Sequence, residues 1–268
     1  FVKIDDAMSL KNKALQGVFW SVIDRLVNQV GYFFVLLYLA RVLTPKDFGL
    51  IGMLAIFMLL ADNIANAGFF QALVQKSNKT TAQDFSTVFV VNLIVSISLY
   101  GVLFIAAPWV ARFYDEPLLI DLARVLFLVI IVNALYVVPK AKLTINVDFK
   151  SQAHANSISV VLSSVVAIVA VKLGFGYWSL VLLSLAKSIA MCGALFFYAH
   201  WKPSVLFNKD SFKQLFGFGS KLLLASIAST FVGNLYTVLI GQFFKAEQVG
   251  YFSQATNLTN VLANTITS

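Results

Sequence analysis

The sequence predicts an all-α fold: a polytopic bundle of transmembrane helices with one six-helix lobe and the first hairpin of a second lobe. Three observations lead to this prediction, namely the apolar composition, the long uncharged spans and an internal repeat. Hydrophobic residues make up 59% of the chain, charged residues only 12%, and the mean hydropathy is +0.84. Soluble domains use about 45–50% apolar residues. One soluble core could not bury this excess, so we expect lipid to surround most of the chain.

Eight segments are apolar enough to be predicted as membrane spans. A crossing helix needs about 20 largely apolar residues. The candidates are roughly 17–40, 48–72, 84–107, 118–138, 154–173, 177–199, 215–240 and 249–268. In hydrocarbon only a helix or a closed barrel satisfies its own backbone. No segment alternates between apolar and polar residues as barrel strands do, so each span is predicted to be helical.

The layout around the first predicted hairpin recurs about 201 residues later. Residues 40–50 and residues 241–251 each follow one apolar span and precede another. In this register Asp47 is equivalent to Gln248, Gly49 to Gly250 and Asn63 to Asn264. Two such copies are a common plan in membrane transporters.

The repeat divides the chain into four predicted parts. They are a cytoplasmic N-terminal segment (1–16), the N-terminal six-helix lobe (17–199), a cytoplasmic inter-lobe linker (200–214) and the truncated start of a C-terminal lobe (215–268).

Basic residues predict the orientation. The side that holds the N-terminus carries Lys3, Lys11, Lys13, Lys76, Lys79, Lys140, Lys142, Lys150, Lys202, Lys209 and Lys213, whereas the opposite loops hold Arg41, Lys46, Arg112, Lys172 and Lys245. The positive-inside rule therefore places the N-terminus in the cytoplasm. The net charge of +8 is interpreted as this loop bias plus contact with anionic membrane lipid, with no nucleic-acid partner.

Sequence signals for enzyme chemistry are absent. There is no His/Cys/Asp cluster with metal-ligand spacing, no phosphate-binding glycine loop and no nucleophile elbow. We therefore expect no catalytic residue, no metal and no other cofactor. No large soluble segment could bind ATP, so any energy source is expected to be an ion gradient or the gradient of the cargo.

Several segments resemble bacterial polysaccharide exporters. They are LKNKALQGVFWS at 10–21, LARVLTPKDFGL at 39–50, FFQALVQK at 69–76, APWVARFY at 107–114, GFGYWSL at 174–180 and FGFG at 216–219. Their order and spacing are similar to those of the Wzx-type exporters of lipopolysaccharide O-antigen and colanic acid. These exporters belong to the multidrug/oligosaccharidyl-lipid/polysaccharide flippase superfamily, and the resemblance covers its N-terminal part.

This resemblance implies a function. Two six-helix lobes would surround a central cavity, and a flippase would move an undecaprenyl-pyrophosphate-linked oligosaccharide across the bacterial inner membrane for lipopolysaccharide or other polysaccharide biosynthesis. Polysaccharide polymerase and chain-length proteins are the implied protein partners. Two alternatives stay open. A multidrug or cation antiporter on the same fold would need an acidic cavity, and a polyprenyl-sugar membrane enzyme would need paired acids or a His in a sizeable outer loop.

Ionisable groups in the first two spans mark one candidate site. Such groups cost about 2.5–3.5 kcal/mol each at membrane depth on insertion scales. Asp24 and Arg25 are expected about 10 Å inside the cytoplasmic end of the first helix, and Asp62 at a similar depth on the second. We interpret them as an Arg25–Asp62 ion pair that locks the hairpin, or as a cavity wall in which Arg25 contacts a phosphate and Asp24 or Asp62 carries a coupling proton. The polar lining would include Asn28, Asn63 and Asn66.

Two lysines complete the predicted anion-binding set with Arg25. Lys187 is near the centre of the sixth span, and no acid in that helix can pair with it. The distance of about 15 Å to either interface is too long for one lysine to snorkel, so a hydrated cavity or an anionic ligand is favoured. Lys221 is within about two turns of the cytoplasmic end of the seventh span, where snorkelling is the alternative. Arg124 is expected to pair with Asp121.

Overall fold

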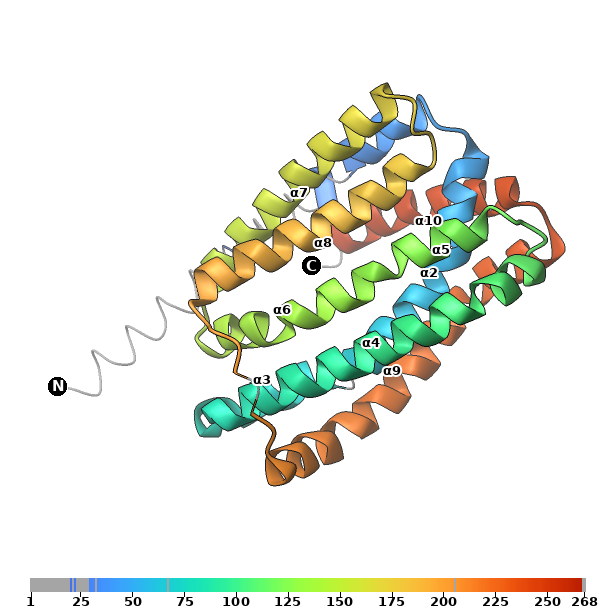
Figure 1. Ribbon diagram of the computed structural model, residues 1–268. Helices are drawn as coiled ribbons and strands as arrows, with labels where there is room; N and C mark the ends of the chain where they lie inside the picture. The colour runs from blue at the N-terminus through green and yellow to red at the C-terminus, as the bar shows by residue number, and fades with distance from the viewer. Residues whose placement is uncertain are drawn as a thin grey trace.

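The computed structural model describes residues 20, 22, 29–31, 33–66, 68–204 and 206–266. The elements are the helices α2 (Pro45–Asn66), α3 (Phe69–Lys76), α4 (Ala82–Phe113), α5 (Leu119–Leu126), α6 (Leu128–Ile145), α7 (Phe149–Lys172), α8 (Trp178–Ala199), α9 (Lys209–Phe243) and α10 (Ala246–Ile266), with a 3₁₀ turn at Ser77–Lys79. A shorter apolar helical segment, Gln29–Ala40, precedes α2. Over the described residues the chain is therefore a helix bundle (Figure 1), as the sequence predicted.

Six of the described helices are long and apolar enough to cross a membrane. They are Pro45–Lys76, Ala82–Phe113, Leu119–Ile145, Phe149–Lys172, Trp178–Ala199 and Lys209–Phe243. The described parts of the predicted spans 17–40 and 249–268 do not belong to this group. Gln29–Ala40 is short, and α10 carries many Ser, Thr, Asn and Gln residues.

Two of the predicted spans are interrupted helices. The second span is α2 followed by α3, with Gly68 between them at φ 70°. The fourth is α5 followed by α6, with Phe127 between them. Gly68 is buried, and a Cβ atom there would lie 2.5 Å from the carbonyl oxygen of Gly219 in α9. Both the left-handed backbone and this close approach require glycine, which explains why the helix changes direction there.

Helix α9 begins earlier than the predicted span 215–240. The Asn208 side chain accepts hydrogen bonds from the backbone N–H groups of Asp210 and Ser211, each at 2.9 Å. This N-cap starts the helix at Lys209, so its first turns are polar and include part of the predicted linker.

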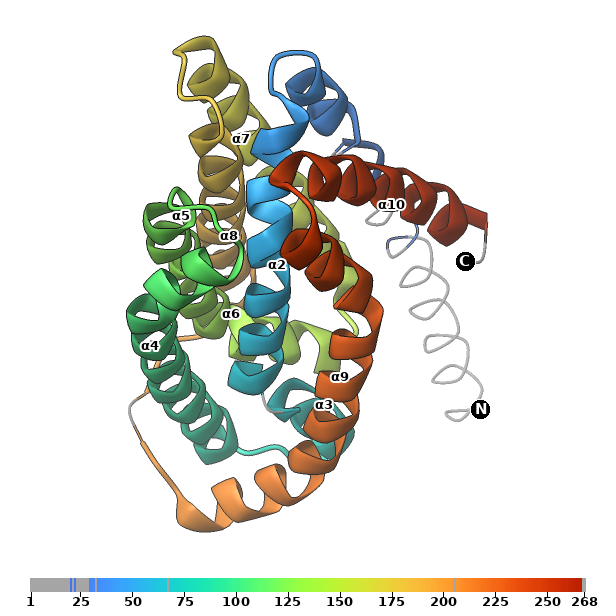
Figure 2. The same ribbon diagram turned by 90° about the vertical axis from the view of Figure 1, so that its right-hand side faces the viewer.

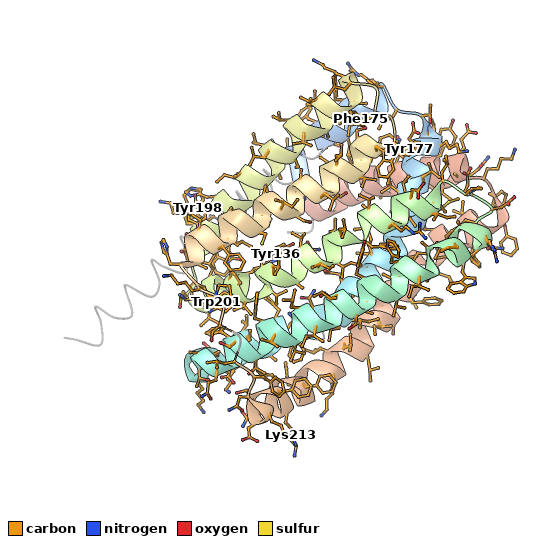
Figure 3. All side chains as sticks on the ribbon, in the orientation of Figure 1. Tyr136, Phe175, Tyr177, Tyr198, Trp201 and Lys213 are labelled. Carbon is orange, nitrogen blue, oxygen red and sulfur yellow. The ribbon has the colours of Figure 1, made fainter. Side chains whose placement is uncertain are left out.

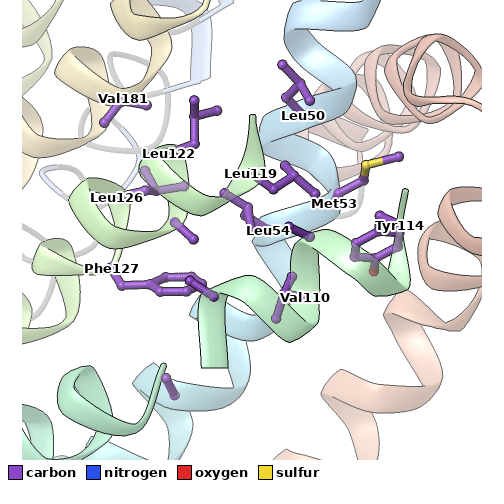
Figure 4. Packing of buried hydrophobic residues seen from close by; sticks show 14 of the residues in the cluster. Leu50, Met53, Leu54, Val110, Tyr114, Leu119, Leu122, Leu126, Phe127 and Val181 are labelled. Atoms are coloured by element: carbon purple, nitrogen blue, oxygen red, sulfur yellow. The ribbon is translucent and has the colours of Figure 1, made fainter. Parts of the chain in front are cut away.

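Helix α2 has the central position in the bundle. Figure 2 shows it between α4 and α5 on one side and α9 and α10 on the other. It packs against α4, α6, α9 and α10, and α7 packs along α8. The largest buried cluster joins Leu50, Met53 and Leu54 of α2 to residues of α4, α5, α8 and α10 (Figure 4).

Aromatic residues mark the two ends of the bundle. Figure 3 shows Phe175 and Tyr177 at one end and Tyr198, Trp201 and Lys213 at the other. Tyr and Trp are enriched where a membrane meets water. Following the predicted orientation, we call the end with Tyr177 the outer end and the end with Trp201 the inner end.

The start of α4 is fixed by a buried carboxylate at the inner end. Asp84 and Thr81 form a capping box, in which the Thr81 N–H donates to Asp84 Oδ2 at 2.8 Å. The Lys76 ammonium pairs with the same oxygen at 2.8 Å, and the Asp84 side chain is 1% exposed. Lys76 was predicted only as a loop charge, because its pairing with Asp84 depends on the turn that returns the chain from α3 to α4.

The Asp84 ion pair predicts a clear stability effect. Asp84→Ala should lower the free energy of unfolding by about 3 kcal/mol or more, because it leaves a partly buried ammonium without its partner and removes a helix cap. Glu116→Ala is the control, since its partner Lys46 is half exposed and such pairs contribute about 0–1 kcal/mol. Unfolding in detergent measures both, and equal effects would contradict the prediction.

Candidate functional site

The polar side chains at mid-depth form a hydrogen-bonded network centred on Asp62 of α2. The Asn133 amide N–H group of α6 donates to Asp62 Oδ1 at 3.3 Å, and Asn66 donates to Asp62 Oδ2 at 3.2 Å. The Asn133 carbonyl oxygen accepts from the hydroxyls of Tyr136 at 2.9 Å and Ser188 at 3.0 Å. The network therefore joins α2, α6 and α8: Asn133 and Asn66 donate to the Asp62 carboxylate, and Tyr136 and Ser188 donate to Asn133.

A second set of hydrogen bonds joins α2 to α9. Asn63 donates to the Thr230 hydroxyl at 2.7 Å and accepts from the Ser226 hydroxyl at 2.9 Å. Asn234, one turn further along α9, donates to the Thr230 carbonyl at 2.8 Å. Asn63 in the last turn of α2 is thus bonded to the middle of α9, a helix that the predicted repeat assigns to its second copy.

The predicted site residues are distributed as follows. Asp24, Arg25 and Asn28 lie outside the described residues, so the predicted Arg25–Asp62 pair stays a prediction. Asp62, Asn63 and Asn66 are half-buried and share one stretch of α2. The Asn66 amide group donates to both the backbone carbonyl oxygen and the carboxylate of Asp62, and Asn63 lies in a helix interface.

The two predicted lysines have different surroundings. Lys187 is half-buried at the centre of α8, directly before Ser188 of the network. Lys221 is exposed on the inner half of α9. Lys187 is therefore the sequence neighbour of a network residue, whereas Lys221 reaches the environment that surrounds α9.

The expected Arg124–Asp121 pair is absent among the described residues. The Arg124 guanidinium lies over the Phe104 ring of α4, 4.6 Å from its centroid, whereas Asp121 is exposed. The guanidinium is thus held by a cation–π contact, and its buried Nε has no hydrogen-bond partner among the described residues.

Four residues around Asp62 were not among the predicted site residues. Asn133, Tyr136 and Ser188 were treated as ordinary span residues, and Lys140 was counted in a loop. The structure places Lys140 inside α6, where its charge interacts favourably with the Asp62 carboxylate. One signal was present, since Asn133, Tyr136 and Lys140 are spaced by three and four residues and share a helix face.

An apolar crevice lies beside these polar groups. It has a volume of about 430 Å³ and opens between α2, α4 and α9. Its lining is Ile56, Phe57, Leu60, Ala106, Trp109, Val110, Phe113, Phe231 and Val238. Within the described residues, no group of three His, Cys, Asp or Glu side chains could hold a metal ion.

Comparison with known proteins places the chain in a family. The sequence pattern of the polysaccharide biosynthesis protein family matches residues 38–268. The chain belongs to this family. No solved structure matches significantly.

Relatives of known name support this membership in the polysaccharide biosynthesis protein family. The chain is 24% identical to the teichuronic acid biosynthesis protein TuaB of Bacillus subtilis over 94% of its length and 53% of the relative. It is 25% identical to the succinoglycan biosynthesis transport protein ExoT of Rhizobium meliloti over 92% and 50%. For the lipopolysaccharide biosynthesis protein WzxC of Escherichia coli the values are 22%, 95% and 52%. The chain thus spans about half the length of these relatives. It is a multi-pass membrane protein of the Wzx type.

The network predicts that Asn133 is the residue whose loss disrupts it most. Asn133→Ala would leave the Tyr136 and Ser188 hydroxyls without an acceptor and remove a donor to Asp62, so stability should fall by about 1–3 kcal/mol. Ser98→Ala is the control, because its hydroxyl is exposed and bonds only within its own helix. Unfolding in detergent provides the measurement.

A double-mutant cycle tests the coupling within the network. Asn133→Ala and Ser188→Ala combined should cost less than the sum of the single changes, because both remove the same hydrogen bond. Strictly additive effects would contradict the network.

Proposed function

We propose that this protein is part of a flippase that exports a lipid-linked oligosaccharide, with an undecaprenyl-pyrophosphate anchor, from the inner to the outer leaflet of a bacterial inner membrane. The observation that carries the proposal is the hydrogen bonding of Asn63 in α2 to Thr230 and Ser226 in α9, which we call the seam, in a family whose named relatives serve polysaccharide biosynthesis and transport. The predicted repeat assigns these two helices to different copies. Polar side chains at the contact between repeats suit a transport path, because cargo crosses a transporter between its repeats.

The surroundings of the seam also suit an amphipathic cargo. On one side of α2 are the amide and hydroxyl groups of the network, which can exchange hydrogen bonds with sugar hydroxyls. Beside α2 and α9 is the apolar crevice, whose Trp109, Phe113 and Phe231 rings are largely exposed. Such a crevice can take up part of a hydrocarbon chain through van der Waals packing, because its lining is as apolar as the lipid that the chain leaves.

Lys187 is proposed as the contact for the pyrophosphate, together with Arg25 and Lys221. An ammonium forms charge-assisted hydrogen bonds with phosphate oxygens, and Lys187 is at the depth where a headgroup would cross. Asp62 is proposed as the coupling group, because it is the carboxylate toward which the network donors point.

The anion contact can be tested by substitution. Lys187→Ala in the complete protein should reduce delivery of lipid-linked oligosaccharide to the outer leaflet by about tenfold or more, the effect of losing a charged hydrogen bond of about 1.5–3 kcal/mol. Lys187→Arg should retain most of the delivery. Lys213→Ala, an exposed lysine at the inner end of α9, is the control. Full delivery by a correctly inserted Lys187→Ala variant would refute the contact.

The coupling role of Asp62 makes a separate prediction. If Asp62 binds and releases a proton, transport should vary with the proton gradient, and Asp62→Asn should remove that variation while cargo binding persists. Uptake by proteoliposomes at several imposed pH gradients measures this. A variant that keeps the pH response of the unaltered protein would exclude Asp62 as the coupling group.

A further inference from the structure

Arg124 in α5 carries a charge at membrane depth that no acid neutralises in the described part of the chain. Within these residues, neither an ion pair nor a hydrogen bond connects its guanidinium to another group. Asp121, three residues earlier in the same helix, is exposed and makes no contact with it. A charge inside a membrane span generally faces a partner, a hydrated cavity or a ligand, so the position of Arg124 points to an anion outside the described protein.

The depth of the guanidinium is close to the outer boundary of the hydrocarbon. Its contact Phe104 lies about 14 Å from the outer end of α4, at 1.5 Å per residue. The 32 residues of α4 extend for about 48 Å, whereas the hydrocarbon core is about 30 Å thick. Centred in the membrane, α4 projects about 9 Å at each end, so the guanidinium lies roughly 5 Å below the lipid headgroups.

The surface around Arg124 is apolar and faces outward from the bundle. Figure 2 shows α4 and α5 at the side of the bundle away from α9 and α10. Large apolar side chains of this region are exposed, including Val102 and Ile105 of α4 and Leu128 at the start of α6. In a membrane protein such a surface contacts lipid, so lipid is the molecule that the guanidinium meets.

Two aromatic residues of α4 hold Arg124 in place. The Tyr100 hydroxyl donates to the backbone carbonyl of Arg124 at 3.2 Å. The Phe104 ring covers one face of the guanidinium, 4.6 Å from its central carbon, and the two rings are 5.9 Å apart. Helix α4 therefore positions both the backbone and the charged group of Arg124, which lowers the cost of ordering the side chain when a ligand binds.

The edge of the guanidinium remains available to an acceptor. Its Nε is enclosed and has no hydrogen-bond partner, whereas the two terminal nitrogens are not among the enclosed polar atoms. A guanidinium presents its N–H donors in a rigid fork that matches the oxygens of a phosphate group. Phosphate is also the anion that every phospholipid headgroup carries, a few ångströms above this position.

We propose that Arg124 binds the phosphate group of a lipid in the outer half of the membrane, with Tyr100 and Phe104 as positioning residues. The acyl or prenyl chain of that lipid would lie over the exposed apolar side chains of α4 and α6. Two lipids carry this chemistry, a phospholipid of the outer leaflet and a lipid-linked pyrophosphate that has been exported. The site goes beyond the proposed transport function and does not depend on it.

Photo-cross-linking tests the site in the complete protein. A phosphatidylglycerol with a diazirine in its headgroup is incorporated into phosphatidylcholine nanodiscs, and labelled fragments that contain residues 97–108 or 118–128 are quantified by mass spectrometry. Arg124→Gln should lower this labelling about tenfold, equivalent to 1.4 kcal/mol. Arg124→Lys should retain more of it, because the charge remains and only the fork is lost. Arg112→Gln, which removes an exposed arginine in the last turn of α4, is the control and should leave this labelling unchanged.

Variants of Phe104 keep the charge and test the positioning role. Phe104→Leu should lower the labelling about threefold, the effect expected for loss of a cation–π contact, and Phe104→Tyr should leave it unchanged because the ring remains. These variants also decide the case if Arg124→Gln fails to insert. Equal labelling of the unaltered protein and of either Arg124→Gln or Phe104→Leu, in correctly inserted protein, would overturn the site.

Competition identifies the source of the phosphate. Unlabelled phosphatidylglycerol and undecaprenyl pyrophosphate are added to the nanodiscs at equal mole fractions. Displacement of the probe by both in similar measure supports a general phospholipid site, and displacement by undecaprenyl pyrophosphate at a tenfold lower fraction supports a site for the exported lipid. If neither lipid displaces the probe, the labelling is non-specific and the proposal is wrong.

Discussion

The pairing of polar groups at membrane depth is the constraint on which the rest of this structure depends. Hydrocarbon offers no hydrogen bonds, so a carboxylate such as Asp62 requires protein donors. Asn133 and Asn66 provide them, and Asn133 is itself held by two hydroxyls. Satisfying one charged group therefore fixes how α2, α6 and α8 lie against each other.

Helix α2 packs against α4 and α6 and also against α9 and α10, which the predicted repeat assigns to its second copy. Asn63 bonds α9 at mid-depth, and Gly49 touches α10 at the outer end. Both contacts are made by the same helix, one through side-chain hydrogen bonds and the other through close backbone packing.

Family membership and geometry give different kinds of information about function. The polysaccharide biosynthesis protein family indicates the process in which the chain takes part. The relatives named for transport or biosynthesis are about twice as long as this chain. The geometry adds which polar side chains join α2 to α6 and α9.

The sequence by itself determined the helical class, most of the spans and the family resemblance. These follow from hydropathy and spacing, which are properties of neighbouring residues. It also indicated Asp62, Asn63 and Asn66, because polar residues stand out in an apolar span. Only the tertiary structure decided their partners, since Asn133 is 71 residues from Asp62 and Ser188 is 55 residues from Asn133. Which helices lie side by side depends on packing across the whole bundle, and no local pattern encodes that choice.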